Sequence, residues 1–231
     1  MRNYNISLML SNFFRTNNKV KKEDLKYTLD KLYKCRDLEI SNLWQRSVFL
    51  SVFLILCFSA YGYIGIELLK IDFNNTKSYL KISTFNLGAV FILSVGIIFS
   101  IIWIMMSKAS KAWYEVYEDA IAKFEKEYFT ELGLPENNIM GNMGFPQGQR
   151  NDSIFSTKGG AFSPSRINVL IGQVSLYLLI LLNLLHLIIS QVFMQNWIFG
   201  VANIIISFIT LILSLILLNS KVAKSGFLNL P

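Results

Sequence analysis

Few side chains in this sequence have the types and spacing that catalysis needs. The only histidine is His186, and it lies inside a long apolar segment, so a histidine metal cluster, a Cys/His nucleophile pair or a Ser/His/Asp triad cannot be assembled. Ser78 and Lys81 have the Ser-x-x-Lys spacing of some acyl enzymes, but the companion motifs of that chemistry are missing. We therefore predict that the protein is not an enzyme and has no catalytic residue, metal site or cofactor.

Polar side chains inside apolar segments form a second group of candidates. They recur at spacings of three and four, which places each set on one helix face. A polar face is costly against lipid, so it must meet protein or water. Helix packing, the lining of a polar conduit and a specific lipid or ligand contact are the three interpretations, and His186 is expected to hydrogen-bond in the core, for instance to Asn203. The residues of this candidate pore or packing face are Asn183, His186, Asn203, Ser207, Thr210 and Ser214.

The elements that position these residues are membrane spans. Hydrophobic residues make up 53% of the 231 residues and charged residues only 16%, and the mean hydropathy is +0.43. Four segments approach the roughly 20 apolar residues that cross a bilayer. They lie near residues 48–66, 87–106, 167–189 and 197–218. The sequence predicts an all-α membrane protein with four transmembrane helices in two hairpins.

The distribution of lysine and arginine predicts the orientation. The segment up to Arg46 has ten, residues 107–166 have seven and the C-terminal tail has two, against three in the loop 67–86 and none in the last loop. Because these residues are enriched on the cytoplasmic side, both termini and the central segment are predicted to be cytoplasmic. The net charge of +7 is mostly this asymmetry, so membrane lipids are the expected partner and direct nucleic-acid contact is not expected.

The first two spans are predicted to continue as long helices into the cytoplasm, over residues 21–132. Beyond the second span an apolar stripe continues at helical spacing, while charged residues, including Glu125, take the other faces. An amphipathic helix draws its stability from packing. We therefore predict that the two extensions bury part of the stripe on each other, and that the rest contacts a sister subunit or another partner protein. It consists of Trp113, Tyr117, Phe124 and Tyr128.

Three further segments flank these helices. Residues 1–20 are predicted to be a tail or an interfacial helix, and residues 220–231 a cytoplasmic tail. Residues 133–166 hold six of the thirteen glycines and three of the four prolines, which predicts a flexible cytoplasmic loop. Small residues in the first span, such as Ser59, Gly62 and Gly65, would let another helix approach closely.

Three blocks of the sequence resemble those of a known family. RDLEISNLWQRS at 36–47, SKASKAWYEVYEDAI at 107–121 and FSPSRINV at 162–169 are similar to blocks in RipA-type octameric bacterial inner-membrane proteins. The first hairpin with its extensions is also similar in plan to the accessory membrane-pore protein of type VI-B CRISPR systems. This resemblance implies a homo-oligomeric ring, possibly eightfold, in the bacterial inner membrane, with a role in stress or anti-phage response. The second hairpin departs from that two-span plan.

Two functional hypotheses follow from the residues and the resemblance. The first is a homo-oligomeric inner-membrane protein that forms a pore or perturbs the membrane, as an effector or accessory subunit of a defence system. The alternative is a non-conducting membrane scaffold or sensor that recruits a cytoplasmic partner, such as a nuclease. The expected partners are membrane lipids, other copies of the chain and, in the second hypothesis, a cytoplasmic defence protein.

Overall fold

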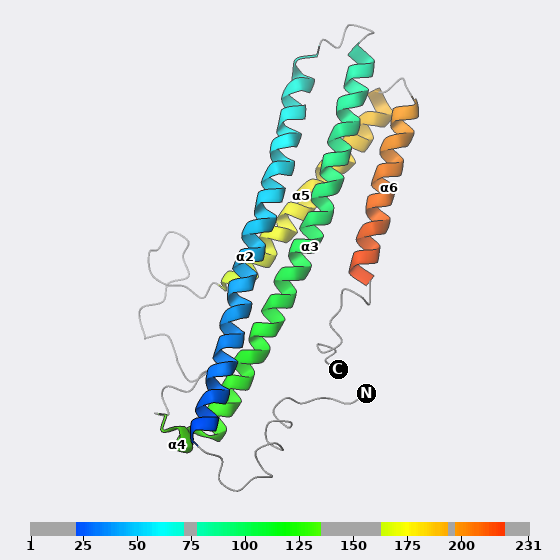
Figure 1. Ribbon diagram of the computed structural model, residues 1–231. Coiled ribbons are helices and arrows are strands. Elements are labelled where there is room, and N and C mark those ends of the chain that lie inside the picture. Colours follow the sequence, from blue (N-terminus) through cyan, green and yellow to red (C-terminus); the bar gives the residue numbers. More distant parts are fainter. Residues whose placement is uncertain (1–21, 72–77, 135–162, 194–196, 220–231) are drawn as a thin grey trace, which may run out of the picture. The chain divides into compact units, whose positions relative to one another are not determined.

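The computed structural model describes residues 22–71, 78–134, 163–193 and 197–219, and its elements are all α-helices (Figure 1). The predicted all-helical class is therefore confirmed. The tail 1–20, most of the predicted loop 133–166 and the tail 220–231 lie outside the described residues. The helices are α2 (Lys22–Leu69), α3 (Ser78–Glu127), α4 (Phe129–Leu132), α5 (Pro164–Phe193) and α6 (Trp197–Asn219).

Four of these helices are long and apolar enough to cross a membrane. They are α2, α3, α5 and α6, and each contains one of the predicted spans. The chain is thus a multi-pass membrane protein by its helix composition. The side of the membrane that each helix end faces stays a prediction.

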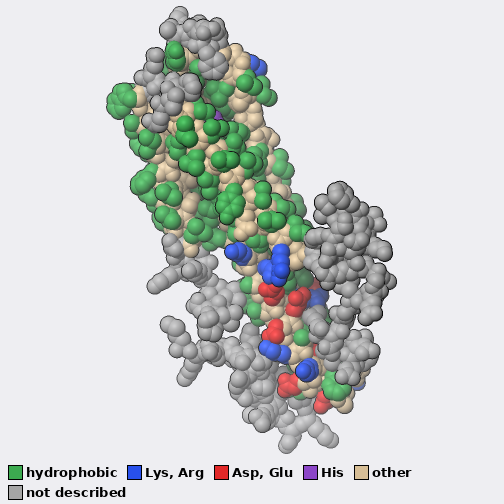
Figure 2. Space-filling model, turned by 180° about the vertical axis from the view of Figure 1, so that it is seen from behind, with side chains coloured by type: hydrophobic (Ala, Val, Ile, Leu, Met, Phe, Trp, Pro, Cys, Tyr) green, Lys and Arg blue, Asp and Glu red, His purple; other side chains and the backbone are tan. Residues whose placement is uncertain are grey.

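The described residues fall into two compact units. The stalk unit holds residues 22–45, 107–134 and 163–167, and the membrane unit holds residues 46–71, 78–106, 168–193 and 197–219. In Figure 2, lysine, arginine and acidic side chains gather on the stalk unit, whereas hydrophobic side chains cover the visible face of the membrane unit. Helices α2 and α3 each contribute to both units, because the sequence has no glycine or proline at either boundary.

Helix α3 is the central helix of the membrane unit. Half of its most apolar stretch is buried, against 17% in α2, 28% in α5 and 17% in α6. Leu93 of α3 and Leu179 of α5 are fully buried in one cluster with Leu50 and Leu54 of α2. A Cβ atom at Gly96 would lie only 3.0 Å from Leu179 Cδ1, so the glycine lets α5 approach α3 closely.

The stalk unit has a separate apolar core between the first half of α2 and the second half of α3. Its buried members are Leu25, Leu29, Ile121, Phe124 and Leu132. The predicted continuous helix to residue 132 is wrong at its end, because α3 ends at Glu127 and the short helix α4 follows. The break lets Leu132 fold back onto this core. Gly133 ends α4 with a φ of +69°, a left-handed conformation that glycine adopts without strain.

Two other predicted boundaries are corrected. Asn86, predicted in the loop 67–86, lies inside α3, which begins at Ser78. Arg166, predicted in the loop 133–166, lies in the first turn of α5, which begins at Pro164. A proline is well suited to this position, since its fixed φ matches the helix and its missing N–H has no intrahelical partner in the first turn.

The glycines of the membrane unit yield a test of this packing. A Cβ atom at Gly172 would lie 2.9 Å from Ile104 Cγ1 and 3.2 Å from Trp103 Cδ1, whereas one at Gly62 would meet nothing within 4 Å. Overpacking costs about 1–3 kcal/mol, which outweighs the gain of about 1 kcal/mol in helix propensity. We expect Gly172→Ala to lower the Tm in detergent and Gly62→Ala, the matched control, not to lower it. An equal Tm for the two variants would contradict the close approach at Gly172.

Candidate functional site

A buried polar cluster joins α2, α3 and α5 around the only histidine of the sequence. His186 Nδ1 lies 2.5 Å from Asn86 Oδ1, and His186 Nε2 lies 3.1 Å from the Tyr61 hydroxyl. The Asn86 amide nitrogen also donates to the backbone oxygen of His186 at 3.4 Å. This pattern is satisfied by a neutral imidazole that carries its proton on Nδ1 and accepts from the tyrosine on Nε2. The cluster therefore needs no charge inside the membrane.

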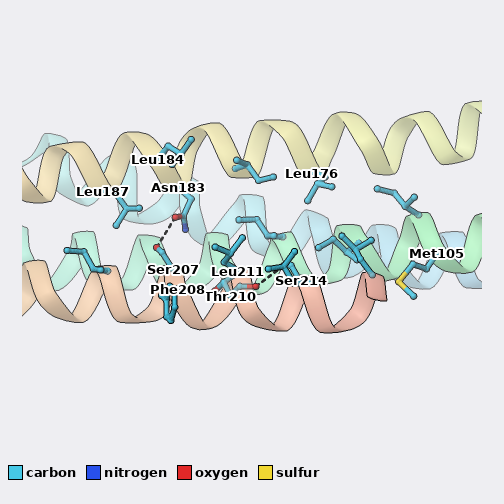
Figure 3. A pocket seen from close by; sticks show the side chains of 17 residues that line it. Met105, Leu176, Asn183, Leu184, Leu187, Ser207, Phe208, Thr210, Leu211 and Ser214 are labelled. Atoms are coloured by element: carbon cyan, nitrogen blue, oxygen red, sulfur yellow. Dashed lines mark hydrogen bonds between the residues drawn. The ribbon is translucent and has the colours of Figure 1, made fainter. Parts of the chain in front are cut away.

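Asn183 connects three helices one turn away from His186. Its amide nitrogen donates to Val90 O and to Ser94 Oγ of α3, both at 3.4 Å. Its amide oxygen accepts from Ser207 Oγ of α6 at 3.0 Å, the bond drawn in Figure 3. Two members of the predicted polar face, Asn183 and Ser207, are thus brought together as a packing contact between α5 and α6.

The other predicted residues of α6 do not join this network. Thr210 Oγ1 donates to Ile206 O at 2.8 Å and Ser214 Oγ donates to Thr210 O at 2.7 Å, both within α6. Asn203 is fully buried, and the described part of the chain gives neither of its amide atoms a hydrogen-bond partner. The expected pairing of His186 with Asn203 is wrong, because the histidine instead bonds to Asn86 and Tyr61.

A second buried polar contact was not predicted from the sequence. Trp103 Nε1 of α3 donates to Asn168 Oδ1 of α5 at 3.1 Å, and the Asn168 amide nitrogen donates to Ser47 Oγ of α2 at 2.5 Å. Asn168 lies at the start of the predicted span 167–189, and Trp103 lies near the end of the predicted span 87–106. Polar groups are common near the ends of apolar runs. The sequence does contain one signal for this contact, the Asn168 amide, because an amide inside a span requires a hydrogen-bond partner.

The side chains of this polar network are joined by hydrogen bonds between helices. Among the described residues, no group of three His, Cys, Asp or Glu side chains could hold a metal ion. The groups of the polar cluster are neutral and already bonded to one another. What this geometry can do is lock the rotation and axial register of α2, α3, α5 and α6.

The predicted stripe of the stalk unit divides into two parts. Phe124 is buried in the core, with Tyr128 packed against it at a ring distance of 5.0 Å. Trp113 and Tyr117 stack at 6.2 Å and are half-buried. The core of this unit therefore covers the end of the stripe within the subunit, and the part that begins at Trp113 keeps some exposed surface.

The structure corrects the placement of Glu125, which was predicted on a charged outer face. Only 2% of its surface is exposed, and its Oε1 accepts from the Tyr33 hydroxyl at 2.6 Å. Glu125 lies one turn from Ile121, on the side of α3 that packs against α2, and the phenol satisfies its carboxylate there. Burial raises the pKa of Tyr33 to about 12, with the hydrogen bond to Glu125 and its negative charge acting in the same direction.

The intramembrane network predicts opposite effects for two asparagines. Replacing Asn86 by Leu leaves His186 Nδ1 without its partner while the Tyr61 contact remains, and we expect a loss of about 1–2 kcal/mol in the free energy of unfolding. Asn203→Leu removes an amide that makes no hydrogen bond in the described residues, and we expect an unchanged or higher free energy of unfolding. Denaturation of the detergent-solubilised protein measures both. The assignment fails if the two substitutions destabilise equally.

The Tyr33–Glu125 pair predicts a pH dependence. The unfolded phenol ionises near 10.0, whereas the folded pKa is about 12, so the neutral phenol is favoured in the folded state. The contribution of this phenol to stability is complete below pH 10 and is lost as the pH rises from 10 to 12. The absorbance difference between the wild type and Tyr33→Phe, which reports ionisation of the Tyr33 phenol, should have its midpoint at a pH of about 12. In a Glu125→Gln background this midpoint should fall but stay above 10, because burial persists.

Comparison with known proteins supports the membrane assignment. No curated protein matches the chain, and no solved structure matches it. The model of the octameric membrane protein family matches residues 26–189, which include most of α2, all of α3 and most of α5, and the match ends before α6. The family name implies a homo-octamer. Because this match covers well over half of the sequence, the chain belongs to the octameric membrane protein family.

Proposed function

We propose that eight copies of this chain form a ring in the bacterial inner membrane, which acts as a non-enzymatic pore-forming or membrane-perturbing subunit. In this proposal the ring is the effector or accessory component of an anti-phage or stress-response system, with both termini in the cytoplasm. The observation that carries the proposal is membership of an octameric membrane protein family, together with the four apolar helices of each subunit.

Eightfold symmetry itself supports an axial opening. Eight helices in a ring, with neighbouring axes about 9 Å apart, have their axes about 12 Å from the centre. Subtracting a helix radius of about 5 Å leaves an opening roughly 14 Å wide. Larger four-helix subunits cannot make it narrower unless one element of each reaches inward. Lipid, water or a further segment of the chain must fill this space.

The polar side chains of the membrane unit favour a path on the symmetry axis over one through each subunit. Asn183, His186 and Ser207 already bond to neighbouring helices, so they are not free to line a conduit inside the subunit. The outer surface left for the axis is mostly apolar. An apolar constriction excludes water and ions until it widens. We therefore expect a ring that is closed at rest and opens on a trigger.

A second candidate is a non-conducting scaffold, and the surface of the stalk unit favours it. Tyr27 is 72% exposed and Leu38 is 60% exposed. Their separation of eleven residues, about three helical turns, puts both on one face of α2. Such side chains are suited to binding a soluble partner protein, such as a nuclease.

Reconstitution tests the pore. The purified oligomer in vesicles of phosphatidylethanolamine and phosphatidylglycerol should release a small trapped dye or pass current when its trigger and genetic partner are present. Native mass spectrometry of the same sample should show eight copies. An octamer that never releases dye or conducts under these conditions would exclude the pore.

The double variant Tyr27→Ala/Leu38→Ala separates the two candidates. If the pore is the function and needs no partner bound at this face, dye release should persist in the variant. If the scaffold is the function, the variant should lose a stoichiometric partner in a pull-down from cells. The double variant Trp44→Ala/Val48→Ala is a matched control, since it also removes two exposed apolar side chains from α2.

A further inference from the structure

Two cationic side chains of the stalk unit lie at the ends of predicted membrane spans. Lys108 of α3 comes two residues after the predicted span 87–106, and Arg166 of α5 directly precedes the predicted span 167–189. Both residues are exposed. Because the ends of membrane spans lie at the level of the lipid headgroups, each cation is at the height of the lipid phosphates.

The two cations lie on corresponding faces of α3 and α5. In the membrane unit these faces line an apolar groove, to which α3 contributes Ile104 and α5 contributes Leu184 (Figure 3). Lys108 follows Ile104 by four residues, about one helical turn. Arg166 precedes Leu184 by eighteen residues, which is about five turns. Each cation therefore continues the face of its own helix that turns toward the groove.

Contacts between α3 and α5 on either side of the two cations keep these helices together. Toward the stalk end, the Tyr114 hydroxyl of α3 and Ser165 Oγ of α5 are 2.6 Å apart. Toward the membrane end, Trp103 Nε1 donates to Asn168 Oδ1 at 3.1 Å. Each cation lies between these two contacts on its own helix, so the long side chains of both can reach one shared group.

Acidic side chains are missing from the helices around the two cations. Neither cation belongs to an ion pair among the described residues. Helix α5 contains no aspartate or glutamate, and the first one on α3 is Glu115. Its carboxylate pairs with Lys111, and α2 has no acidic residue over 40–66. An anion that neutralises the two cations therefore comes from outside these helices.

The position of Arg166 is not explained by the stability of α5. It lies in the first turn of this helix, where the helix dipole opposes cations and favours anions. An anion beside Arg166 is attracted by both the side chain and the helix end, and phospholipid phosphates are the anions at this level of a membrane. We propose that Lys108 and Arg166 together bind the phosphate of one anionic phospholipid in the leaflet next to the stalk unit.

Lipid competition on the purified oligomer tests this proposal. The full-length protein is delipidated in detergent and titrated with phosphatidylglycerol and with phosphatidylethanolamine, and native mass spectrometry counts the lipids retained. Two interfacial cations predict a preference of about 30-fold for phosphatidylglycerol, which corresponds to about 2 kcal/mol. Equal affinity of the wild type for the two lipids would overturn the proposal.

A charge-removing variant gives the second measurement. Lys108→Gln/Arg166→Gln should lose this preference, and each single substitution should lower the phosphatidylglycerol affinity about fivefold. The matched control is Lys34→Gln/Lys126→Gln, which also removes two exposed cations from the stalk unit but far from the predicted spans. It should leave the affinity unchanged. An equal loss in both double variants would assign the binding to the general charge of the stalk unit and contradict the site.

A soluble headgroup distinguishes a lipid from a free phosphate as the ligand. Glycerophosphoglycerol is the headgroup of phosphatidylglycerol without its acyl chains, and at millimolar concentration it should leave the bound lipid in place. Displacement of the lipid would show that a soluble phosphate is the ligand. If the double variant does not assemble, the wild-type preference and this competition decide. The readout does not require conduction, so failure of the pore leaves the lipid site intact.

Discussion

In the hydrocarbon core of a membrane no water is available to polar groups, so a polar group without a partner inside the protein is costly. The membrane unit follows from this constraint. Asn86, Asn183 and His186 turn inward and bond across three helices, while the faces that remain outside are apolar. The central position of α3 has the same origin, because small residues such as Gly96 let a neighbouring helix come close enough for these bonds.

The same two helices meet the opposite requirement in the stalk unit. In water the apolar side chains must be buried, and α2 and α3 bury Leu25, Ile121 and Phe124 against each other. The Tyr33–Glu125 hydrogen bond sits at the edge of this core. It lets a carboxylate lie on the packed side of the helix, at the cost of a raised phenol pKa. Helices α2 and α3 therefore bury an apolar core in the stalk unit and bonded polar side chains in the membrane unit, and each remains one continuous helix.

The polar bonding inside the membrane unit leaves an apolar outer surface, and this surface affects how subunits could assemble. In the membrane unit most of the buried polar side chains bond within the subunit and the exposed side chains are mostly apolar. In the proposed ring this apolar surface meets lipid, a neighbour or the axis. The match to the family model covers residues 26–189, so α6 lies outside the matched residues.

The sequence by itself determined the number of membrane helices, their approximate extents and the continuity of the first two into the stalk. These properties are sums over neighbouring residues, since the transfer free energy of a segment and the absence of helix breakers need no knowledge of the fold. The amphipathic pattern likewise identified Asn183, His186 and Ser207 as inward-facing. The pattern could not identify the hydrogen-bond partner of each side chain.

Only the tertiary structure decided the partners. His186 bonds to Asn86 and Tyr61 rather than to Asn203, and Glu125 is buried rather than solvated. Both outcomes depend on the rotation and axial register of one helix against another, where a shift of one residue turns a side chain by about 100°. That register is set by close contacts such as Gly96 against Leu179, which join residues far apart in the sequence and leave no periodic signal in it.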